Sequence, residues 1–274
     1  MATFDTESGR VTIEIVYYGP AGAGKTTNLE SLSPIVQLSA PRRITPRRVG
    51  ANRVFAISVP AGSLGSMLGA EIAVNAVTIQ GPVTGEDAWT RLIYDADGIV
   101  FVADSFPGAR SDNARALKTL RNELKLRESA RANPPVVLQW NKRDLADARP
   151  IVQLDYEFNH EGYPSLPATA IRGTGVVETF TSILTRAVTA TYRARGGNAA
   201  GESALEQSLS RAFVKTIDDR RQTSIEQFGS TIPLQSVAEP SPRSAFDSPP
   251  NHRPTSEGTH VRRVPKSDVT DPVV

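Results

Sequence analysis

Runs of apolar residues alternate with stretches of helical periodicity through residues 1–195. The continuous apolar run at 99–103 is typical of a strand that is covered on both faces, and residues 136–140 predict another buried strand. Between them, residues 112–130 place four apolar side chains on one stripe, which predicts an amphipathic helix that ends before Pro134. Strand and helix in alternation predict an α/β fold of three layers with a mostly parallel sheet.

Further segments fit the same alternation. The other predicted strands cover residues 11–18, 54–59, 73–79 and 166–170, and the other predicted helices begin at Lys25 and cover 176–192.

The pattern changes after Arg195, where the alternation is lost. We therefore predict a domain over 1–195, then a linker over 196–228 with a possible amphipathic helix that is isolated or induced by a partner. The last segment, 229–274, holds 8 prolines and one aromatic residue, Phe246. So little apolar surface does not offset the entropy of ordering, and this tail is predicted to be largely disordered.

Composition narrows the classes of function. Apolar residues make up 39% of the chain, and 31 basic against 29 acidic residues leave a net charge of +2, so no bulk positive field favours nucleic acid. The absence of cysteine excludes disulfides and thiolate-ligated metals, and three histidines argue against a His-rich metal site.

No apolar run is long enough to span a membrane, and Asp5 and Glu7 stand where a signal peptide would be basic. We expect a cytoplasmic protein with no transmembrane segment and no nucleic-acid partner.

The most specific motif is Gly19 to Thr26, which matches G-x-x-x-x-G-K-[ST] between a predicted strand and a predicted helix. Consecutive backbone N–H groups at the start of a helix surround phosphate oxygens. In such a loop Lys25 reaches the β and γ phosphates, and the Thr26 hydroxyl binds Mg²⁺. The predicted nucleotide contacts are Gly19, Ala21, Gly22, Ala23, Gly24, Lys25, Thr26 and Thr27.

A second motif, Asn141-Lys142-Arg143-Asp144, follows the predicted strand at 136–140. A carboxylate at Asp144 accepts hydrogen bonds from N1–H and the 2-amino group of guanine, whereas adenine offers neither donor. Lys142 can lie over the base, and Asn141 can tie the loops together. Thr169 and Ala170, after the next strand, are placed where a backbone N–H meets the guanine oxygen. The pattern predicts binding of GTP and GDP.

These segments resemble the bacterial Ras-like GTPases of the MglA (gliding-motility) type over about residues 9–194. The resemblance implies a cytoplasmic Ras-like switch that is active when GTP is bound with Mg²⁺, and that hydrolyses GTP slowly until a Roadblock-domain partner assists it. It also implies a role in cell polarity or motility, without indicating the downstream effector. The matching segments are 16–20, 24–29, 97–105 and 141–145.

The second switch region departs from this family. Counting back from Asp97 without a gap aligns Gly81 with the glycine whose N–H contacts the γ phosphate. Pro82 then stands in place of the glutamine that orients the attacking water, and proline has neither a polar side chain nor an N–H. Gln80 could replace this glutamine only if the loop were rearranged.

The first switch region is also altered. Arg53 fits the family's internal arginine finger. Together with the two residues expected to contact the phosphates, it completes the set of candidate catalytic residues: Lys25, Arg53 and Gly81. Val54 replaces a threonine and has no hydroxyl for Mg²⁺. In the second switch region, Thr78 stands in place of the usual D-x-x-G aspartate, as is common in the MglA type, so outer support for the metal is thin.

Three functions remain open at this point. The first is a GTPase switch with slow turnover. The second is a pseudo-GTPase binding module or scaffold, in which the nucleotide is a structural cofactor and the tail docks onto another protein. The third, an ATP-dependent kinase or ATPase, is disfavoured by Asn141 to Asp144. For Asp104, at the end of a predicted strand, a loop-capping role is favoured over ligand binding.

Overall fold

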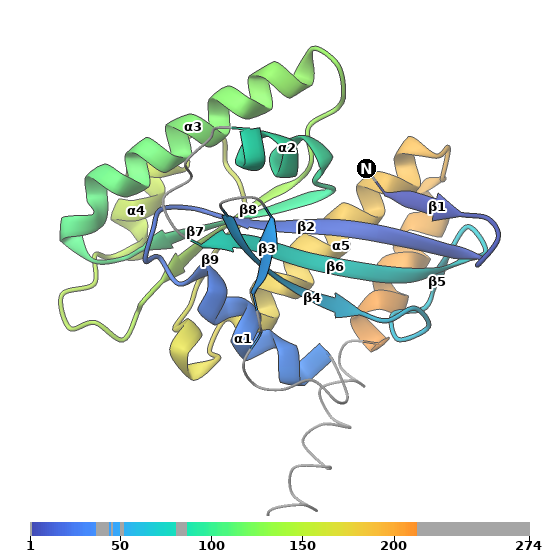
Figure 1. The fold of residues 1–274 in the computed structure, drawn as a ribbon, viewed down its shortest axis with the longest axis horizontal. Helices are drawn as coiled ribbons and strands as arrows, with labels where there is room; N and C mark the ends of the chain where they lie inside the picture. The colour runs from blue at the N-terminus through green and yellow to red at the C-terminus, as the bar shows by residue number, and fades with distance from the viewer. Residues whose placement is uncertain (1, 37–43, 45, 50–51, 81–86, 213–274) are drawn as a thin grey trace, which may run out of the picture. The chain divides into compact units, whose positions relative to one another are not determined.

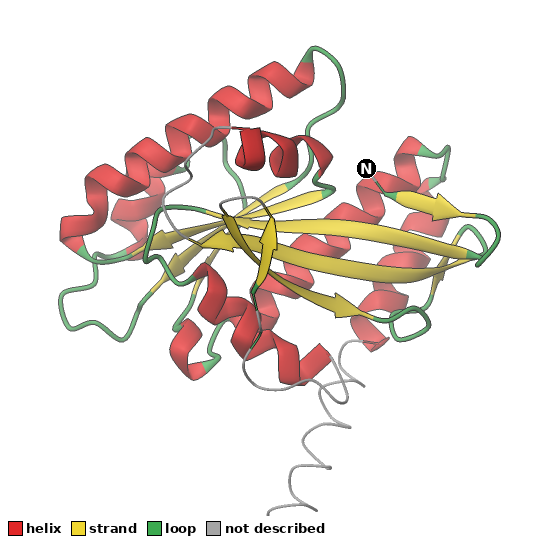
Figure 2. Ribbon diagram, in the orientation of Figure 1, coloured by secondary structure: helices red, strands yellow, loops and turns green. Residues whose placement is uncertain are grey.

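The computed structural model describes residues 2–36, 44, 46–49, 52–80 and 87–212. These residues form one sheet with helices on both faces, as Figures 1 and 2 show. The strands are β1 (Thr3–Asp5), β2 (Arg10–Tyr18), β3 (Arg47–Val49), β4 (Asn52–Val59), β5 (Ser66–Met67), β6 (Ala70–Gln80), β7 (Gly98–Asp104), β8 (Val136–Asn141) and β9 (Ser165–Pro167). The helices are α1 (Lys25–Val36), α2 (Asp87–Asp95), α3 (Arg110–Glu128), α4 (Ile151–Phe158) and α5 (Val176–Ala194), with short 3-10 turns at Pro107–Ala109 and Ala170–Arg172.

The strands are ordered β3-β4-β6-β2-β7-β8-β9. The five strands from β6 to β9 run parallel, β4 is antiparallel to β6, and β3 is antiparallel to β4. This arrangement confirms the predicted α/β fold with a mostly parallel sheet. The carboxyl ends of parallel strands meet at one edge, so the loops after β2, β7, β8 and β9 lie close together there.

Each face of the sheet carries its own core. Along β2, Ile13, Ile15 and Tyr17 pack with α1 and α5, whereas Val16 and Tyr18 pack with α2 and α3. Strands buried on both faces have no polar side, which explains the continuous apolar run of β7 and the mostly apolar sequence of β8. In Figure 1, α2, α3 and α4 lie on one side of the sheet and α1 and α5 on the other.

Several elements were not predicted from the pattern. These are β1, β3, β5, α2 and α4. In α4, Val152 and Tyr156 are exposed, so the apolar residues do not form one buried stripe. The strand predicted at 166–170 is wrong in its extent, because β9 ends at Pro167. Beyond it the N–H of Thr169 donates to the carbonyl of Thr174, and that of Ala170 donates to the Asn141 side chain, so the chain leaves the sheet.

A further helix covers residues 199–212, the last part of the chain that the structure describes. Its Leu205 and Leu209 are buried in the core that also holds α1 and α5. In the described structure this helix is therefore packed on the sheet domain, whereas the sequence suggested an isolated or partner-induced helix. The predicted tail at 229–274 lies outside the described residues. Across the described part of the chain, no helix combines the length and the apolar character needed to cross a bilayer.

Candidate functional site

The phosphate-binding loop joins β2 to α1 and depends on two glycines. Gly19 has φ +144°, and a Cβ there would lie 2.1 Å from the carbonyl oxygen of Val102. Gly24 has φ +99°, and its Cβ would lie 2.2 Å from Nδ2 of Asn141. Positive φ and close approach both exclude a side chain, so the loop needs glycine at each position.

Lys25 is buried beneath this loop, with 8% of its surface exposed. Its Nζ donates to the carbonyl oxygens of Gly19 and Pro20, at 2.9 and 2.8 Å. Burial lowers the pKa of Lys25 to about 8, because the charged form loses hydration. A phosphate group beside the ammonium would oppose this shift, so the lysine is placed where an anion stabilises it.

This pKa predicts a pH dependence of nucleotide affinity. Above about pH 8 the free protein holds Lys25 neutral, so binding to the charged form requires proton uptake. We expect the GDP affinity to fall by up to tenfold per pH unit between about pH 8 and about pH 9. Calorimetry in buffers of different ionisation enthalpy measures both the affinity and the proton uptake. The control is Lys25→Arg, which stays charged over this pH range, so its pH profile shows only the contribution of guanine ionisation. If the two proteins had equal pH profiles, Lys25 would not be the group that causes the loss of affinity.

Asn141 connects the two predicted nucleotide loops to each other. It is 2% exposed, and its Nδ2 donates to the carbonyl oxygen of Ala23 at 2.8 Å. Its Oδ1 accepts a hydrogen bond from the backbone N–H of Ala170 at 2.9 Å. Ser31, from α1, donates to the carbonyl oxygen of the same alanine at 2.6 Å. One side chain therefore fixes the phosphate loop, the β8 loop and the loop after β9 in a single arrangement.

Replacing Asn141 with alanine should weaken GDP binding by about 10- to 100-fold, because two buried hydrogen bonds between the loops are lost. Displacement of a fluorescent GDP analogue measures this change. Asn122→Ala on α3 is the matched control, with an amide that lies outside these loops. An unchanged affinity in a folded Asn141 variant would show that the loops are held together by other contacts.

The other residues of the second motif differ in their surroundings. Lys142 has φ +63°, and its Nζ pairs with Oδ2 of Asp104 at 2.6 Å. Asp104 also accepts a hydrogen bond from the N–H of Phe106 at 3.0 Å, so it caps the loop and positions Lys142. Asp144 is exposed, and no hydrogen bond or ion pair ties its carboxylate to the described residues. That carboxylate is free to accept from a ligand.

A buried polar network behind the phosphate loop was missed from the sequence. The side chains of Asn28 and Gln139 exchange two hydrogen bonds, at 2.8 and 2.9 Å, and Asn28 also donates to the carbonyl oxygen of Gly24. Gln139 donates further to the Thr179 hydroxyl at 2.9 Å. The available signal was a polar residue within the apolar run of β8. The network joins α1, β8 and α5 behind the loop.

The switch residues are only partly described. Arg53 is exposed on β4, in register with Gln80 of β6. Thr78 is buried, and its hydroxyl donates to the carbonyl oxygen of Tyr17 at 2.8 Å, so it is occupied by the backbone. Val54 is half-buried on β4. Because β6 runs parallel to β2, with Val16 in register with Val77, Arg53 lies at the edge of the sheet that carries the phosphate loop. Gly81 and Pro82 lie outside the described residues.

The remaining predicted contacts surround the start of α1. Thr26 and Thr27 are half-buried in its first turn. Ala21 and Gly22 are exposed in the loop, and Thr169 is 7% exposed beside Ala170. Among the described residues, no group of three or more His, Asp or Glu side chains could hold a metal ion. In a phosphate loop of this sequence, the Thr26 hydroxyl would hold a Mg²⁺ ion together with phosphate oxygens.

A cavity of about 630 Å³ opens beside the loop and is bounded by α2 and α3. Tyr18, Pro20 and Lys25 line its loop side. The rings of Tyr18 and Trp89 meet edge to face, with centroids 4.9 Å apart. This contact fixes the first turns of α2 against the end of β2.

Comparison with known proteins agrees with the geometry. No family model matches the chain. The mutual gliding-motility protein MglA of Myxococcus xanthus (strain DK1622) is 29% identical over 183 residues, which cover 67% of this chain and 94% of that protein. The phosphate loop, the Asn-Lys-x-Asp loop fixed to it and this likeness together support an MglA-like GTPase of the Ras type.

Proposed function

We propose that the chain binds GTP and GDP with Mg²⁺ and acts as a molecular switch that hydrolyses GTP slowly. The observation that carries the proposal is the Asn141 side chain, which bonds to the phosphate loop and to the loop after β9 and lies three residues before the exposed carboxylate of Asp144. Lys25 and the loop N–H groups would hold the phosphates, Thr26 would bind the metal, and Asp144 would read the base. The N–H of Ala170 donates to Asn141, so it reaches the guanine oxygen only by sharing that bond.

Slow turnover follows from the groups that are replaced. Val54 offers no hydroxyl, and the hydroxyl of Thr78 is held by the carbonyl oxygen of Tyr17. Pro82 supplies no group to orient water. A water that is not oriented for in-line attack reacts rarely, even when the phosphates are well held.

The cellular role is proposed from the likeness to MglA, whose name refers to gliding motility. We propose a role in cell polarity or motility within the cytoplasm, with a Roadblock-domain protein that accelerates hydrolysis. A protein activator fits a site that lacks its own water-orienting residue, because the missing polar group can be supplied by a partner.

The competing function is a pseudo-GTPase binding module, which is favoured by the missing hydroxyl at Val54 and by the Thr78 hydroxyl that is held by the backbone. A single-turnover experiment separates the two. The full chain is loaded with GTP and Mg²⁺, and bound nucleotide is separated by chromatography over hours. Conversion to GDP supports a slow switch, whereas GTP that persists unchanged supports the module. Displacement of bound GTP by excess ATP would contradict both of these functions.

A further inference from the structure

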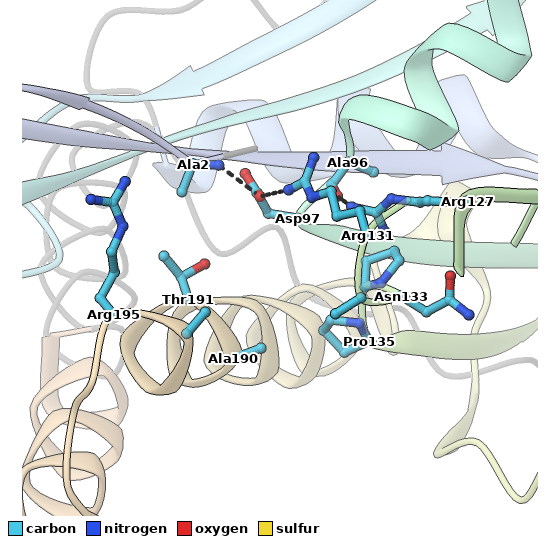
Figure 3. Close-up of a pocket in the computed structure, with 13 residues that line it drawn as sticks. Ala2, Ala96, Asp97, Arg127, Arg131, Asn133, Pro135, Ala190, Thr191 and Arg195 are labelled. Carbon is cyan, nitrogen blue, oxygen red and sulfur yellow. Dashed lines mark hydrogen bonds and ion pairs between the residues drawn. The ribbon is translucent and has the colours of Figure 1, made fainter. Parts of the chain in front are cut away.

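A second cavity lies at the amino ends of the parallel strands, opposite the edge that carries the phosphate loop (Figure 3). It has a volume of about 210 Å³ and is bounded by the turn before β7, by the end of α3 with its following loop, and by the end of α5. Its charged lining residues are three arginines and one carboxylate: Arg127, Arg131, Arg195 and Asp97. The cavity is therefore positively charged.

Arg127 is the most buried of these groups, with 2% of its surface exposed. One terminal nitrogen donates to the carbonyl oxygen of Ala96 at 2.9 Å. Its Nε and its other terminal nitrogen are buried without a hydrogen-bond partner among the described residues. Burial, followed by repulsion from Arg131, lowers the pKa of Arg127 to about 10, although Asp97 and Asp95 act in the opposite direction. A guanidinium buried in this way keeps a positive charge that its hydrogen bonds do not neutralise, and an anion in the adjacent cavity would offset that charge.

The Asp97 carboxylate does not pair with the Arg127 guanidinium, because it accepts hydrogen bonds from backbone N–H groups. It accepts hydrogen bonds from the N–H of Ala2 at 2.7 Å and from the N–H of Glu14 at 3.0 Å. Its contact with Arg131 is longer, at 3.4 Å, and the bond from Arg131 to the carbonyl oxygen of Tyr94 is 3.3 Å. Arg131 is thus weakly held by its present partners and can turn toward a ligand.

Arg195 supplies the third positive charge from the end of α5. Its guanidinium lies over the Phe4 ring, 4.2 Å from the centroid, which fixes the side chain without neutralising it. Figure 3 shows Arg195 on the other side of Asp97 from Arg127. Guanidinium groups that line one cavity from the end of α3 and the end of α5 favour a ligand with several oxygens.

We propose that this cavity binds a phosphate group, either as inorganic phosphate or as a small phosphate monoester. Several acceptor oxygens on one centre can serve more than one arginine, which a single neutral acceptor cannot. A water molecule takes about 30 Å³ in the liquid, so the cavity also has room for a small substituent on the phosphate. Nothing in the proposed GTPase function uses these residues.

The test is NMR of the ¹⁵N-labelled full chain, with GDP and Mg²⁺ in excess so that the phosphate loop is filled. Inorganic phosphate is titrated at constant ionic strength, and glycerol phosphate and acetate are titrated in parallel. We expect saturable shifts of the amides at 96–98, 127–133 and 191–195. The tighter of the two phosphate ligands then identifies the form that the cavity prefers. The readout is local to the cavity, so it does not depend on nucleotide binding.

Two variants make the test specific. Arg131→Gln should weaken phosphate binding by about tenfold or more, because it removes a charged donor from a partly exposed side chain. Arg186→Gln, which removes an exposed arginine elsewhere on α5, should leave the affinity unchanged. The absence of saturable shifts at these amides would overturn the proposal. So would equal effects of the two variants, or binding of acetate as tight as that of phosphate.

Discussion

Replacing Asp144 with asparagine should lower the affinity for GDP by about 10²-fold or more. The carboxylate would accept two hydrogen bonds from guanine, and an amide cannot accept both while presenting its own NH₂ donors to the base. The same change should improve the affinity for xanthosine diphosphate, because xanthine has a carbonyl where guanine has the 2-amino group. Exposure of Asp144 keeps the cost to folding small.

Competition of GDP, xanthosine diphosphate and ADP against a fluorescent GDP analogue measures this switch in preference. Asp147→Asn is the matched control, since it removes an exposed carboxylate three residues further along the same loop. If both variants kept the preference for GDP, Asp144 would not be the residue that reads the base.

Restoring the missing switch groups should accelerate hydrolysis. We expect the double variant Pro82→Gln with Val54→Thr to raise the single-turnover rate by about 10²- to 10³-fold, which is the usual effect of one preorganised polar group. Glutamine would orient the attacking water, and threonine would offer a hydroxyl to Mg²⁺. Rates are measured on protein that is already loaded with GTP, so a change in GTP affinity does not affect the measured rate.

Pro82→Ala with Val54→Thr is the control, because it removes the proline without adding the polar group at that position. If the two double variants hydrolysed GTP equally fast, the gain would come from the backbone or from Val54 and not from water orientation. An unchanged rate in the glutamine variant, with GDP binding intact, would refute the alignment that places Pro82 at the water-orienting position.

The sequence predicted those elements whose signals are local. β7 is a continuous apolar run, β8 is apolar except for Gln139 and its last residue, and α3 carries a regular stripe that ends before Pro134. The short α4 exposes Val152 and Tyr156, so its apolar residues do not form one stripe from which a buried helix face could be predicted. Helix 199–212 has only two buried leucines in the described structure, and only tertiary packing reveals the core that receives them.

The candidate site likewise contains short motifs that the sequence reveals and long-range contacts that it does not. The phosphate loop and the Asn-Lys-x-Asp loop are short motifs, and their spacing from strands indicated a common edge. The reciprocal bonds between Asn28 and Gln139 join residues 111 positions apart, and no local pattern indicates such a pair. Arg127 and Arg131 resemble the solvated charges of a helix end, and their burial follows only from the position of α5.

The central place of β2 has a consequence for biosynthesis. Its parallel partners lie far along the chain: Val16 is in register with Val77 of β6 and with Ile99 of β7. The ribosome therefore releases this apolar strand long before either neighbour is made. Such a strand is exposed to aggregation until its partners arrive. Chaperone capture of nascent chains should accordingly be strongest before β7 emerges and should decline once that strand can complete the middle of the sheet.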